Sequence, residues 1–185
     1  LNLAPNYDLT LTPSFMSRRG GKLDGAFRYM TEHCGSGQIR GGYLPNDNQY
    51  DNNDSADLHF LHYWKINKQW STNLEYNYAS DKDYFADFEN NPNSKTDVNL
   101  RRAWELNYQN GIPGLKAQLK VEDFQTLDKT IKDADKPYAR LPQFLLNYVT
   151  GDPQGLQYEF NNDTAYFKKS INDDSALESS GTRIY

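Results

Sequence analysis

The chain has 185 residues, with 20 Lys and Arg against 25 Asp and Glu, which gives a formal net charge of −5. This acidic balance argues against nucleic acid as a partner. The mean hydropathy of −0.91 would suit a disordered chain, but 14% of the residues are aromatic, and disordered chains avoid such a content. No segment approaches the ~20 apolar residues of a membrane-spanning helix, so a helical membrane protein is excluded. A transmembrane β-barrel is not excluded, because its strands place every second residue toward a polar lumen and are therefore hydrophilic on average.

Apolar residues recur at every second position along most of the chain, a period that predicts an all-β fold. In chain order, strands are expected over residues 1–4 (partial), 7–14, 23–30, 38–44, 58–66, 70–78, 98–108, 115–122, 141–149, 156–167 and 182–185 (partial). The clearest alternation is in residues 70–78, where Trp70, Leu74 and Tyr76 share one face. In residues 98–108, Arg102 is the one misfit among the apolar positions.

The predicted connections alternate between tight turns and long polar loops. The tight ones are residues 5–6, 33–37, 67–69, 110–114 and 150–155, rich in Gly, Pro, Asn and Asp. The long ones are residues 45–56, 81–97, 126–138 and 169–180, and residues 17–22 form a middling one in a long position. Outer-membrane barrels sort their connections in this way, with short periplasmic turns and long extracellular loops.

Strand length and aromatic placement favour the same interpretation. Strands of about 9–11 residues are long enough to cross a bilayer when tilted. Aromatic residues near the expected strand ends suit interfacial girdles, namely Trp64, Trp70, Tyr78, Trp104, Tyr108 and Tyr148. The fold class is therefore predicted to be all-β, with antiparallel up-and-down strands forming part of a large transmembrane outer-membrane β-barrel. A soluble β-sandwich is the alternative, because half-buried antiparallel sheets also alternate.

The sequence opens and closes inside expected strands, and residues 1–4 are too short to cross a membrane. We therefore expect residues 1–185 to be one partial β-barrel domain of a larger protein.

No pattern of catalytic or metal-binding residues stands out. His59 and His62 fall on opposite faces of one expected strand, so they cannot hold a metal together. Residues 81–87 have acidic spacing but lack the Gly and the closing Glu of a calcium loop. The lone Cys34 is interpreted as a buried or idle thiol. Because no nucleophile accompanies a base, an enzyme is not expected.

Two prolines fall inside expected strands. Pro13 and Pro142 each lack the N–H that a ladder hydrogen bond needs. Such strands are weakly paired, unless the proline occupies a strand end or a β-bulge.

Motifs spread over most of the chain resemble a known family. They are Leu1-Asn2-Leu3-Ala4-Pro5-Asn6-Tyr7-Asp8 followed by Pro13, Met16 and Arg19-Gly20; Phe27-Arg28-Tyr29; Tyr43-Leu44-Pro45-Asn46-Asp47; Leu61-His62-Tyr63-Trp64; Asn73-Leu74-Glu75-Tyr76; Ser80-Asp81-Lys82-Asp83-Tyr84-Phe85-Ala86-Asp87-Phe88; and Leu141-Pro142-Gln143 with Asn147-Tyr148. In this order they resemble the lipopolysaccharide-assembly family LptD, also called organic solvent tolerance protein. Lys82 departs from the pattern, since family members often carry Pro there.

The resemblance implies a translocon in the outer membrane of a Gram-negative cell, which inserts lipopolysaccharide into the outer leaflet through a barrel lumen and a lateral gate. The family barrel has about 26 strands and is plugged by the lipoprotein LptE. A periplasmic β-jellyroll precedes it and receives lipopolysaccharide from the bridge protein LptA. Residues 1–185 would then cover roughly the first half of the barrel, without the jellyroll and the closing strands. No cofactor, metal or catalytic residue is implied.

The resemblance also suggests roles for individual residues. Pro5 and Pro13 are expected to weaken the seam of the gate, and Pro13 matches a family gate proline. The lumen-facing candidates are Asn73, Glu75, Asn77, Lys116, Gln118 and Lys120. Outer-membrane lipid is expected to meet Leu74, Tyr76, Leu115 and Leu119. Cys34 matches none of the family's disulfide cysteines.

Two functions from other classes remain as alternatives. A general outer-membrane porin or channel would share the pattern of strands and loops but not the ordered motifs. A soluble carbohydrate-binding β-sandwich would fold as a monomer without detergent.

Overall fold

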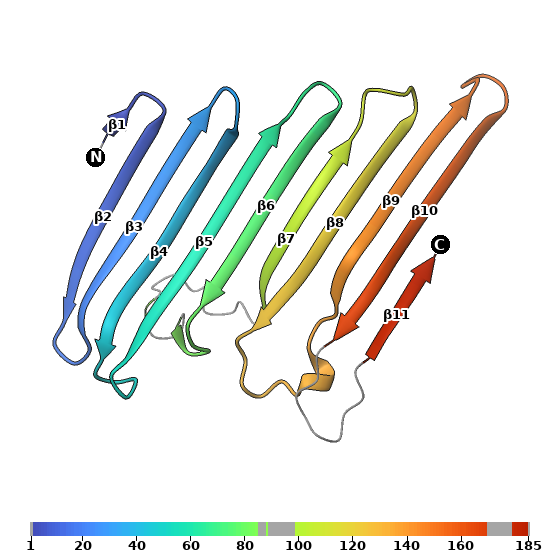
Figure 1. Cartoon of the computed structure of the whole chain (residues 1–185). Helices are drawn as coiled ribbons and strands as arrows, with labels where there is room; N and C mark the ends of the chain where they lie inside the picture. The colour runs from blue at the N-terminus through green and yellow to red at the C-terminus, as the bar shows by residue number, and fades with distance from the viewer. Residues whose placement is uncertain (1, 85–87, 89–98, 170–178, 185) are drawn as a thin grey trace. The chain divides into compact units, whose positions relative to one another are not determined.

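The structure, a computed structural model, describes the chain except residues 1, 85–87, 89–98, 170–178 and 185 (Figure 1). Its strands are β1 (Asn2–Ala4), β2 (Tyr7–Met16), β3 (Gly20–Thr31), β4 (Gly35–Asp47), β5 (Asn53–Lys65), β6 (Trp70–Ala79), β7 (Asn99–Tyr108), β8 (Leu115–Thr126), β9 (Ala139–Gly151), β10 (Gln157–Lys169) and β11 (Ser179–Ile184). A short 3-10 helix, η2 (Asp133–Asp135), precedes β9. In the described ranges, no helix is long and apolar enough to cross a membrane.

The strands follow one another through a single sheet in the order β1 to β11, so each is hydrogen bonded to its neighbours in the sequence. The registers of β2 with β3, of β3 with β4 and of β9 with β10 are antiparallel. The expected all-β, antiparallel up-and-down fold is confirmed, and each predicted strand corresponds to an observed one.

Most strands are longer than the sequence predicts, and at β4 and β5 the difference removes an expected loop. β4 continues to Asp47 and β5 begins at Asn53, so the expected long loop at residues 45–56 is wrong. Asp54 holds the two strands together, since its Oδ1 accepts a hydrogen bond from the backbone N–H of Asn46 and its Oδ2 accepts one from Tyr43 Oη. Side-chain hydrogen bonds thus keep a polar, turn-like sequence in strand conformation.

The predicted alternation of connections holds in the second half of the chain only. The long connections are residues 80–98, 127–138 and 170–178. Residues 17–19 and 48–52 lie at the same end of the strands, where long loops are expected, but they are short. Most of residues 80–98 and all of residues 170–178 lie outside the described residues.

The chain forms two compact units. The first consists of Leu1–His62, Glu75–Arg102 and Gln125–Thr130, and the second of Tyr63–Leu74, Ala103–Phe124 and Ile131–Tyr185. The first unit contains β1 to β4 whole, and the second contains β9 to β11 whole; β5 to β8 each contribute residues to both units.

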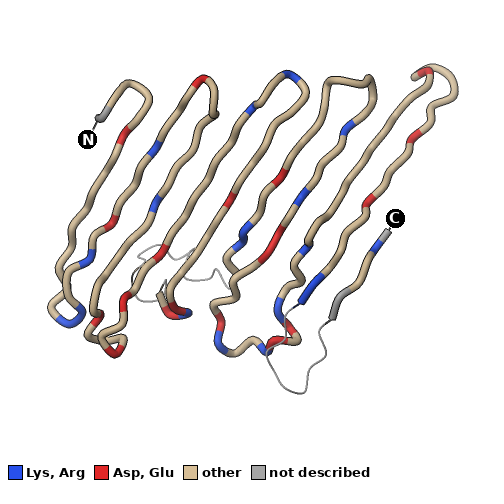
Figure 2. The backbone as a smooth tube through the Cα atoms, in the orientation of Figure 1, with Lys and Arg blue, Asp and Glu red and all other residues tan. Residues whose placement is uncertain are grey.

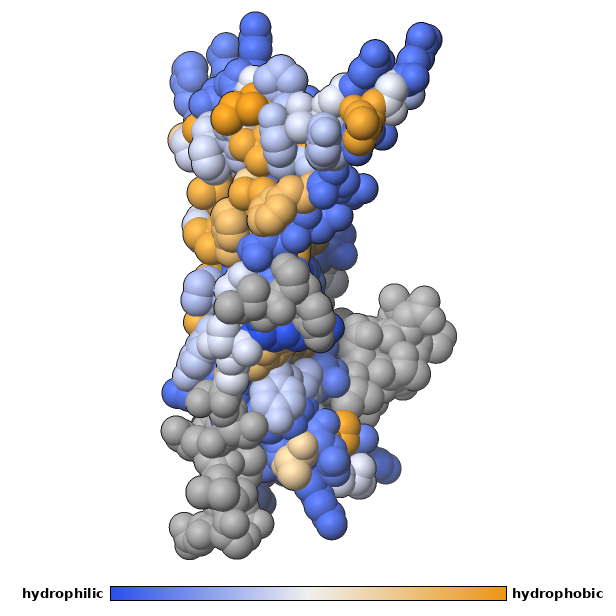
Figure 3. Space-filling view, turned by 90° about the vertical axis from the view of Figure 1, so that its right-hand side faces the viewer, coloured by the Kyte–Doolittle hydropathy of each residue, from blue (hydrophilic) through white to orange (hydrophobic). Residues whose placement is uncertain are grey.

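In both units the alternation of residues divides the strands into a polar and an apolar side. In the first unit, the register pairs Asp8 with Arg28 and Thr12 with Asp24 on one side, and Leu9 with Phe27 on the other. In the second, Lys116 opposes Asn147, and Leu119 opposes Phe144. Figure 3, a view onto the side of β10 and β11, shows hydrophobic residues gathered toward one side of the second unit.

Charged residues of both signs are spread along the strands and their connections (Figure 2). A small buried cluster lies where β6, β7 and β8 meet their connections, and it consists of Ala79, Tyr84, Leu100 and Leu127 with Phe88 packed against it. Few side chains are fully buried elsewhere in the described residues, because both faces of a single sheet stay accessible.

Candidate functional site

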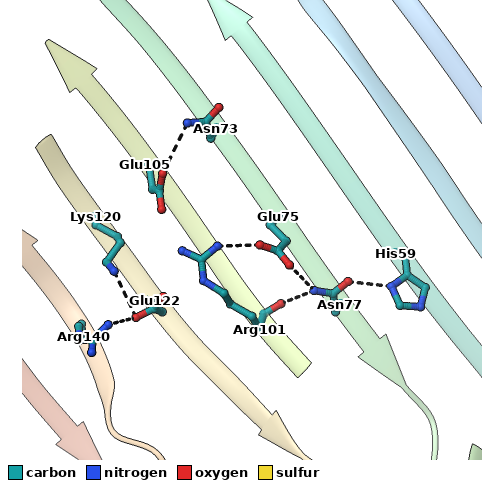
Figure 4. A network of polar contacts seen from close by, with 9 residues as sticks. All are labelled: His59, Asn73, Glu75, Asn77, Arg101, Glu105, Lys120, Glu122 and Arg140. Atoms are coloured by element: carbon teal, nitrogen blue, oxygen red, sulfur yellow. Dashed lines mark hydrogen bonds and ion pairs between the residues drawn. The ribbon is translucent and has the colours of Figure 1, made fainter. Parts of the chain in front are cut away.

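Polar side chains of three neighbouring strands form a chain of contacts on the polar side of the first unit (Figure 4). Arg101 Nη1 of β7 donates to Glu75 Oε2 of β6 at 2.6 Å. Asn77 Nδ2 donates to Glu75 Oε1 at 3.0 Å and to the carbonyl oxygen of Arg101 at 2.7 Å. His59 Nδ1 of β5 lies 2.7 Å from Asn77 Oδ1. These bonds fix the orientation of each amide, carboxylate and imidazole at this wall.

A groove of about 490 Å³ lies beside this chain of contacts. Its lining comes from β2 to β6 and includes Thr12, Asp24, Arg40, Asp57 and Glu75. Hydroxyl, carboxylate and guanidinium groups therefore face one shared space, which suits a ligand rich in hydroxyls and charged groups.

The second unit has polar contacts of its own. Gln118 Nε2 of β8 donates to Asn107 Oδ1 of β7 at 2.7 Å, and Asn73 Nδ2 lies 3.5 Å from Glu105 Oε2. A groove of about 390 Å³ is lined here by polar residues of β7 to β10, including Lys116. The groove also exposes apolar area from its leucines, so it is less polar than the groove of the first unit.

Glu122 is the most deeply buried charge in the second unit's polar contacts. Its carboxylate accepts a hydrogen bond from Arg140 of β9, and Lys120 Nζ lies 3.4 Å away (Figure 4). Its side chain is only 4% exposed, whereas the side chain of Glu75 in the first unit is 33% exposed. Lys120 of the same strand and Arg140 of β9 offset the cost of burying this carboxylate, because an unpaired buried charge is costly.

The six lumen-facing candidates fall into two groups. Glu75 and Asn77 join the contacts of the first unit, and Asn73, Gln118 and Lys120 join those of the second. Lys116 lines the second unit's groove. Sequence reasoning missed the partners His59, Arg101, Glu105, Glu122 and Arg140. The alternation of side chains would have placed Arg101 and Glu105 with the polar set, but pairing with a distant strand leaves no local signal.

The connection after β6 folds back onto the first unit through Tyr84. Tyr84 is 1% exposed, and its Oη donates to Asp57 Oδ1 at 2.5 Å. Burial, the hydrogen bond to Asp57 and the nearby carboxylates together raise the pKa of the Tyr84 phenol. Asp57 Oδ1 also accepts from the backbone N–H of Gly42, at 2.8 Å. A Cβ on Gly42 would lie 2.7 Å from Tyr84 Oη and 2.8 Å from Asp57 Oδ1.

Pro5 lies before β2 and Pro13 lies inside it. Pro5 is in the turn between β1 and β2, beside a small groove of about 340 Å³. Pro13 opposes Leu23 inside β2. The backbone N–H of Met30 donates to the carbonyl of Asn6, so these two residues form a hydrogen-bonded pair. Hydrogen-bonded and non-hydrogen-bonded pairs alternate along an antiparallel ladder. Counted from Asn6, the Pro13–Leu23 pair is a non-hydrogen-bonded one. The missing N–H of Pro13 therefore faces away from β3.

Pro142 lies in an irregular part of the sheet. The registers of β9 with β8 and with β10 both shift between Arg140 and Gln143. Two residues of β9 there oppose one on each neighbour, which is the count of a β-bulge. Pro142 therefore lies in a β-bulge, one of the two positions expected from the sequence as alternatives to a weakly paired strand.

Other candidates from the sequence carry no chemistry in the structure. Among the described residues, no group of three His, Cys, Asp or Glu could hold a metal ion. His62 Nδ1 lies 2.6 Å from Tyr29 Oη, away from the contacts of His59. Cys34 is exposed in the connection between β3 and β4, so of the predicted buried or idle thiol the buried alternative is wrong. Residues 85–87 of the weak calcium motif lie outside the described residues.

The wall of a membrane β-barrel is an up-and-down antiparallel sheet with one polar and one apolar side, and the sheet of this chain has the same pattern. Residues 52–185 match the model of the family LptD, described as LPS transport system D. The chain belongs to this family, as the sequence resemblance predicts.

Relatives named LPS-assembly protein LptD match all or most of the chain. One from Acinetobacter baumannii is 76% identical over 185 residues, covering 100% of this chain and 23% of the relative. One from Psychrobacter cryohalolentis is 44% identical over 192 residues, covering 100% of this chain and 19% of the relative. One from Vibrio vulnificus is 40% identical over 149 residues, covering 80% of this chain and 19% of the relative. The chain thus spans about a fifth to a quarter of these relatives.

Proposed function

We propose that residues 1–185 form part of an outer-membrane β-barrel that inserts lipopolysaccharide into the outer leaflet of a Gram-negative cell. The observation that carries this proposal is a two-sided, up-and-down antiparallel sheet in a chain of the LptD family. On this proposal the polar side faces the lumen and the apolar side faces lipid. The domain is then a partial barrel, and the whole barrel includes further strands.

The chemistry of the polar side supports a path for the head of a glycolipid. Such a head carries sugar hydroxyls and phosphates, and the amides and charges along the grooves can exchange hydrogen bonds with both. Lys116 at the groove of the second unit supplies a cation that can attract phosphate. Acyl chains need an apolar surface, so they have to leave the lumen sideways rather than along it.

The missing N–H of Pro13 supports a lateral gate. An N–H that is missing on the side away from β3 weakens whichever strand pairs there, by about 0.5–1.5 kcal/mol for one net hydrogen bond. Pro5, in the turn before β2, also lacks a backbone N–H. A seam with few bonds opens more readily than the rest of a barrel wall.

The proposal extends to partners and excludes catalysis. LptE as the plug in the lumen and LptA as the periplasmic bridge are the partners that the family resemblance implies. The protein works as a transporter and not as an enzyme, because its task is to move a lipid without making or breaking a covalent bond.

The test is depletion of the full-length protein in its native cell. Newly made lipopolysaccharide should then stop reaching the cell surface and accumulate in inner compartments, and re-expression of the full-length protein should reverse this. Depletion that leaves surface lipopolysaccharide unchanged would contradict the proposal. If the purified full-length protein then conducts ions in planar bilayers, the porin alternative would take its place.

A further inference from the structure

Arg102 is a charged residue on the apolar side of β7. It follows Arg101, which points to the polar side and pairs with Glu75, so the side chain of Arg102 leaves the sheet on the opposite side. On the lipid-facing side of a barrel an Arg is costly at the middle of the membrane and much better tolerated near its interfaces. The position of its guanidinium therefore decides how well it is tolerated.

The guanidinium of Arg102 lies at the level of strand ends. Its Nη2 donates to Gln125 Oε1 at 2.7 Å, one residue before the end of β8. The same Gln125 amide bonds both backbone groups of Ala79, the last residue of β6. The Arg102 side chain thus points toward the end of the strands where the connections of residues 80–98 and 127–138 begin.

Two tyrosine rings hold the guanidinium at this level. The Arg102 Cζ atom lies 5.1 Å from the centroid of the Tyr76 ring and 6.0 Å from that of Tyr78. Both rings are exposed, at 37% and 38%. The rings orient the cation by cation–π attraction and leave it half-buried, so part of it is accessible from the apolar side.

The charge of Arg102 is not neutralised by the residues around it. In the described part of the chain, its partners are the carbonyl of Asn77, the amide of Gln125 and the two rings, and all of them are neutral. Its Nη1 has no hydrogen-bond partner there. An oriented cation with donors to spare, exposed to lipid at an interface, matches an anion that comes from the lipid.

We propose that Arg102, Tyr76 and Tyr78 form an external binding site for the phosphate of a phosphorylated glycolipid in the outer leaflet. This inference rests on the proposed function for its orientation, because the long connections have to be extracellular. Arg suits a phosphate because its planar N–H groups match the phosphate oxygens. The glycolipid acyl chains would lie along the exposed apolar side chains below the site. The site would keep delivered lipid in contact with the outer wall of the barrel.

The experiment uses the full-length protein in nanodiscs, with Tyr78 replaced by the photocrosslinking residue p-benzoylphenylalanine, which keeps an aromatic ring. Three membranes are compared: phospholipid alone, phospholipid with lipopolysaccharide, and phospholipid with lipopolysaccharide whose lipid A phosphates have been removed. We expect a crosslink to lipopolysaccharide that falls several-fold when its phosphates are removed. This comparison needs no further variant, so it does not depend on how a mutant folds.

Arg102→Gln should lower the crosslink to intact lipopolysaccharide several-fold, and Arg102→Lys should keep part of it. Arg101→Gln is the matched control, because it removes the same charge from the opposite side and should leave the crosslink unchanged. Heat-modifiable migration on gels verifies that each variant has assembled. An Arg102→Gln variant with an undiminished crosslink, or equal yields with and without the lipid phosphates, would overturn the proposal. If Tyr78 crosslinks to phospholipid as strongly as to lipopolysaccharide, and both crosslinks depend on Arg102, the ligand is not specifically a glycolipid and that part of the proposal is overturned.

These crosslinks report on lipid already in the membrane and do not require transport. A failure of the site would therefore leave the depletion test of the proposed function untouched. If instead the depletion test fails while the crosslink succeeds, the site stands without the transport role.

Discussion

Pro13 of β2 opposes Leu23 of β3 in a non-hydrogen-bonded pair, so the N–H that Pro13 lacks would have faced away from β3. The ladder between these two strands therefore loses nothing to the proline. On the other side, β1 pairs with β2 at Tyr7 and Asp8 only, and no described strand lies beside Pro13 there. The missing N–H of Pro13 therefore affects only the pairing of β2 on its side away from β3.

We predict that Pro13→Val impairs release of lipopolysaccharide without impairing assembly. Valine restores one N–H at the edge and favours strand conformation, which strengthens the seam by about 0.5–1.5 kcal/mol. Lipopolysaccharide should accumulate in the periplasm, as measured by fractionation, while protein level and LptE association stay normal. The control is Leu11→Val, which lies on the same side of β2 and already has its N–H. A Pro13→Val strain that keeps its full barrier to large hydrophobic antibiotics would show that this bond does not limit transport.

The orientation of β8 can be tested with one charge on either side. Arg in place of Leu119 should reduce the amount of assembled barrel, because a charge near the middle of the lipid-facing side costs about 2–4 kcal/mol. Arg in place of Gln118, its neighbour on the polar side, should be tolerated. Leu74→Arg and Asn73→Arg form a second pair of the same design on β6. Heat-modifiability of the full-length protein measures assembly, and equal tolerance on both sides would reverse or abolish the assigned faces.

The topology predicts opposite exposure for the two connections that flank β9. An epitope inserted after Asp133, in the connection before β9, should be labelled by antibody on intact cells. An epitope inserted after Gln154, in the connection after β9, should be labelled only after the outer membrane is permeabilised. Labelling in the opposite order would turn the sheet over in the membrane, and Arg102 would then lie at the inner leaflet.

Because Glu122 and Glu75 are buried to different extents, loss of their charges should reduce the stability of the barrel by different amounts. Glu122→Gln removes the charge from a side chain that is 4% exposed and leaves Lys120 and Arg140 without their anion; since Arg140 is itself 38% exposed, the loss should fall below the roughly 3–5 kcal/mol of a fully buried pair but above that of an exposed pair. Glu75→Gln breaks a pair that is about one third exposed, so the loss should be about 0–1 kcal/mol. Thermal unfolding of the two variants of the full-length barrel measures the difference. A larger loss for Glu75→Gln would contradict this ranking.

The Tyr84 phenol should stay protonated at alkaline pH. Its raised pKa means that ionisation is disfavoured in the folded state, so its stabilising effect is present in full below the ordinary tyrosine pKa of about 10. That effect is lost as the pH rises above this value, because the unfolded chain then gains by ionising and the folded one does not. Tyrosine absorbance near 295 nm measures ionisation, and the wild-type titration minus that of Tyr84→Phe should show no step near pH 10. A step at that pH would mean that Tyr84 is exposed to solvent.

The period of apolar residues was enough to locate each strand, because a strand with one apolar face carries an apolar residue at every second position. It failed at β4 and β5, where Asp47 and Asp54 suggested a loop. Asp47 is instead buried, with Arg19 Nη1 at 3.0 Å and Ser55 Oγ at 3.2 Å from its Oδ2. Local composition cannot reveal such partners, since Arg19 is far away in the sequence.

The same limit applies to the candidate site. Residues such as Asn73 and Glu75 could be assigned to a side by alternation alone, but the contacts that orient them depend on register between strands. The contact of Tyr84 with Asp57 could not be predicted for the same reason, because Asp57 belongs to β5, on the other side of β6 from the connection that carries Tyr84. The sequence did mark Arg102 as exceptional, and the structure then supplied the neighbours that explain it.

A Cβ on Gly42 would lie 2.6 Å from Asp24 Oδ1, 2.7 Å from Tyr84 Oη and 2.8 Å from Asp57 Oδ1, so the Tyr84 oxygen reaches Asp57 through space that a side chain on Gly42 would occupy. A methyl group and that oxygen cannot be there together. In relatives of this chain, an alanine or larger residue at the position of Gly42 should therefore occur only where the position of Tyr84 has lost its hydroxyl. Residues 42 and 84 are thus expected to be inherited as a pair, although they lie on different segments and their backbones share no hydrogen bond.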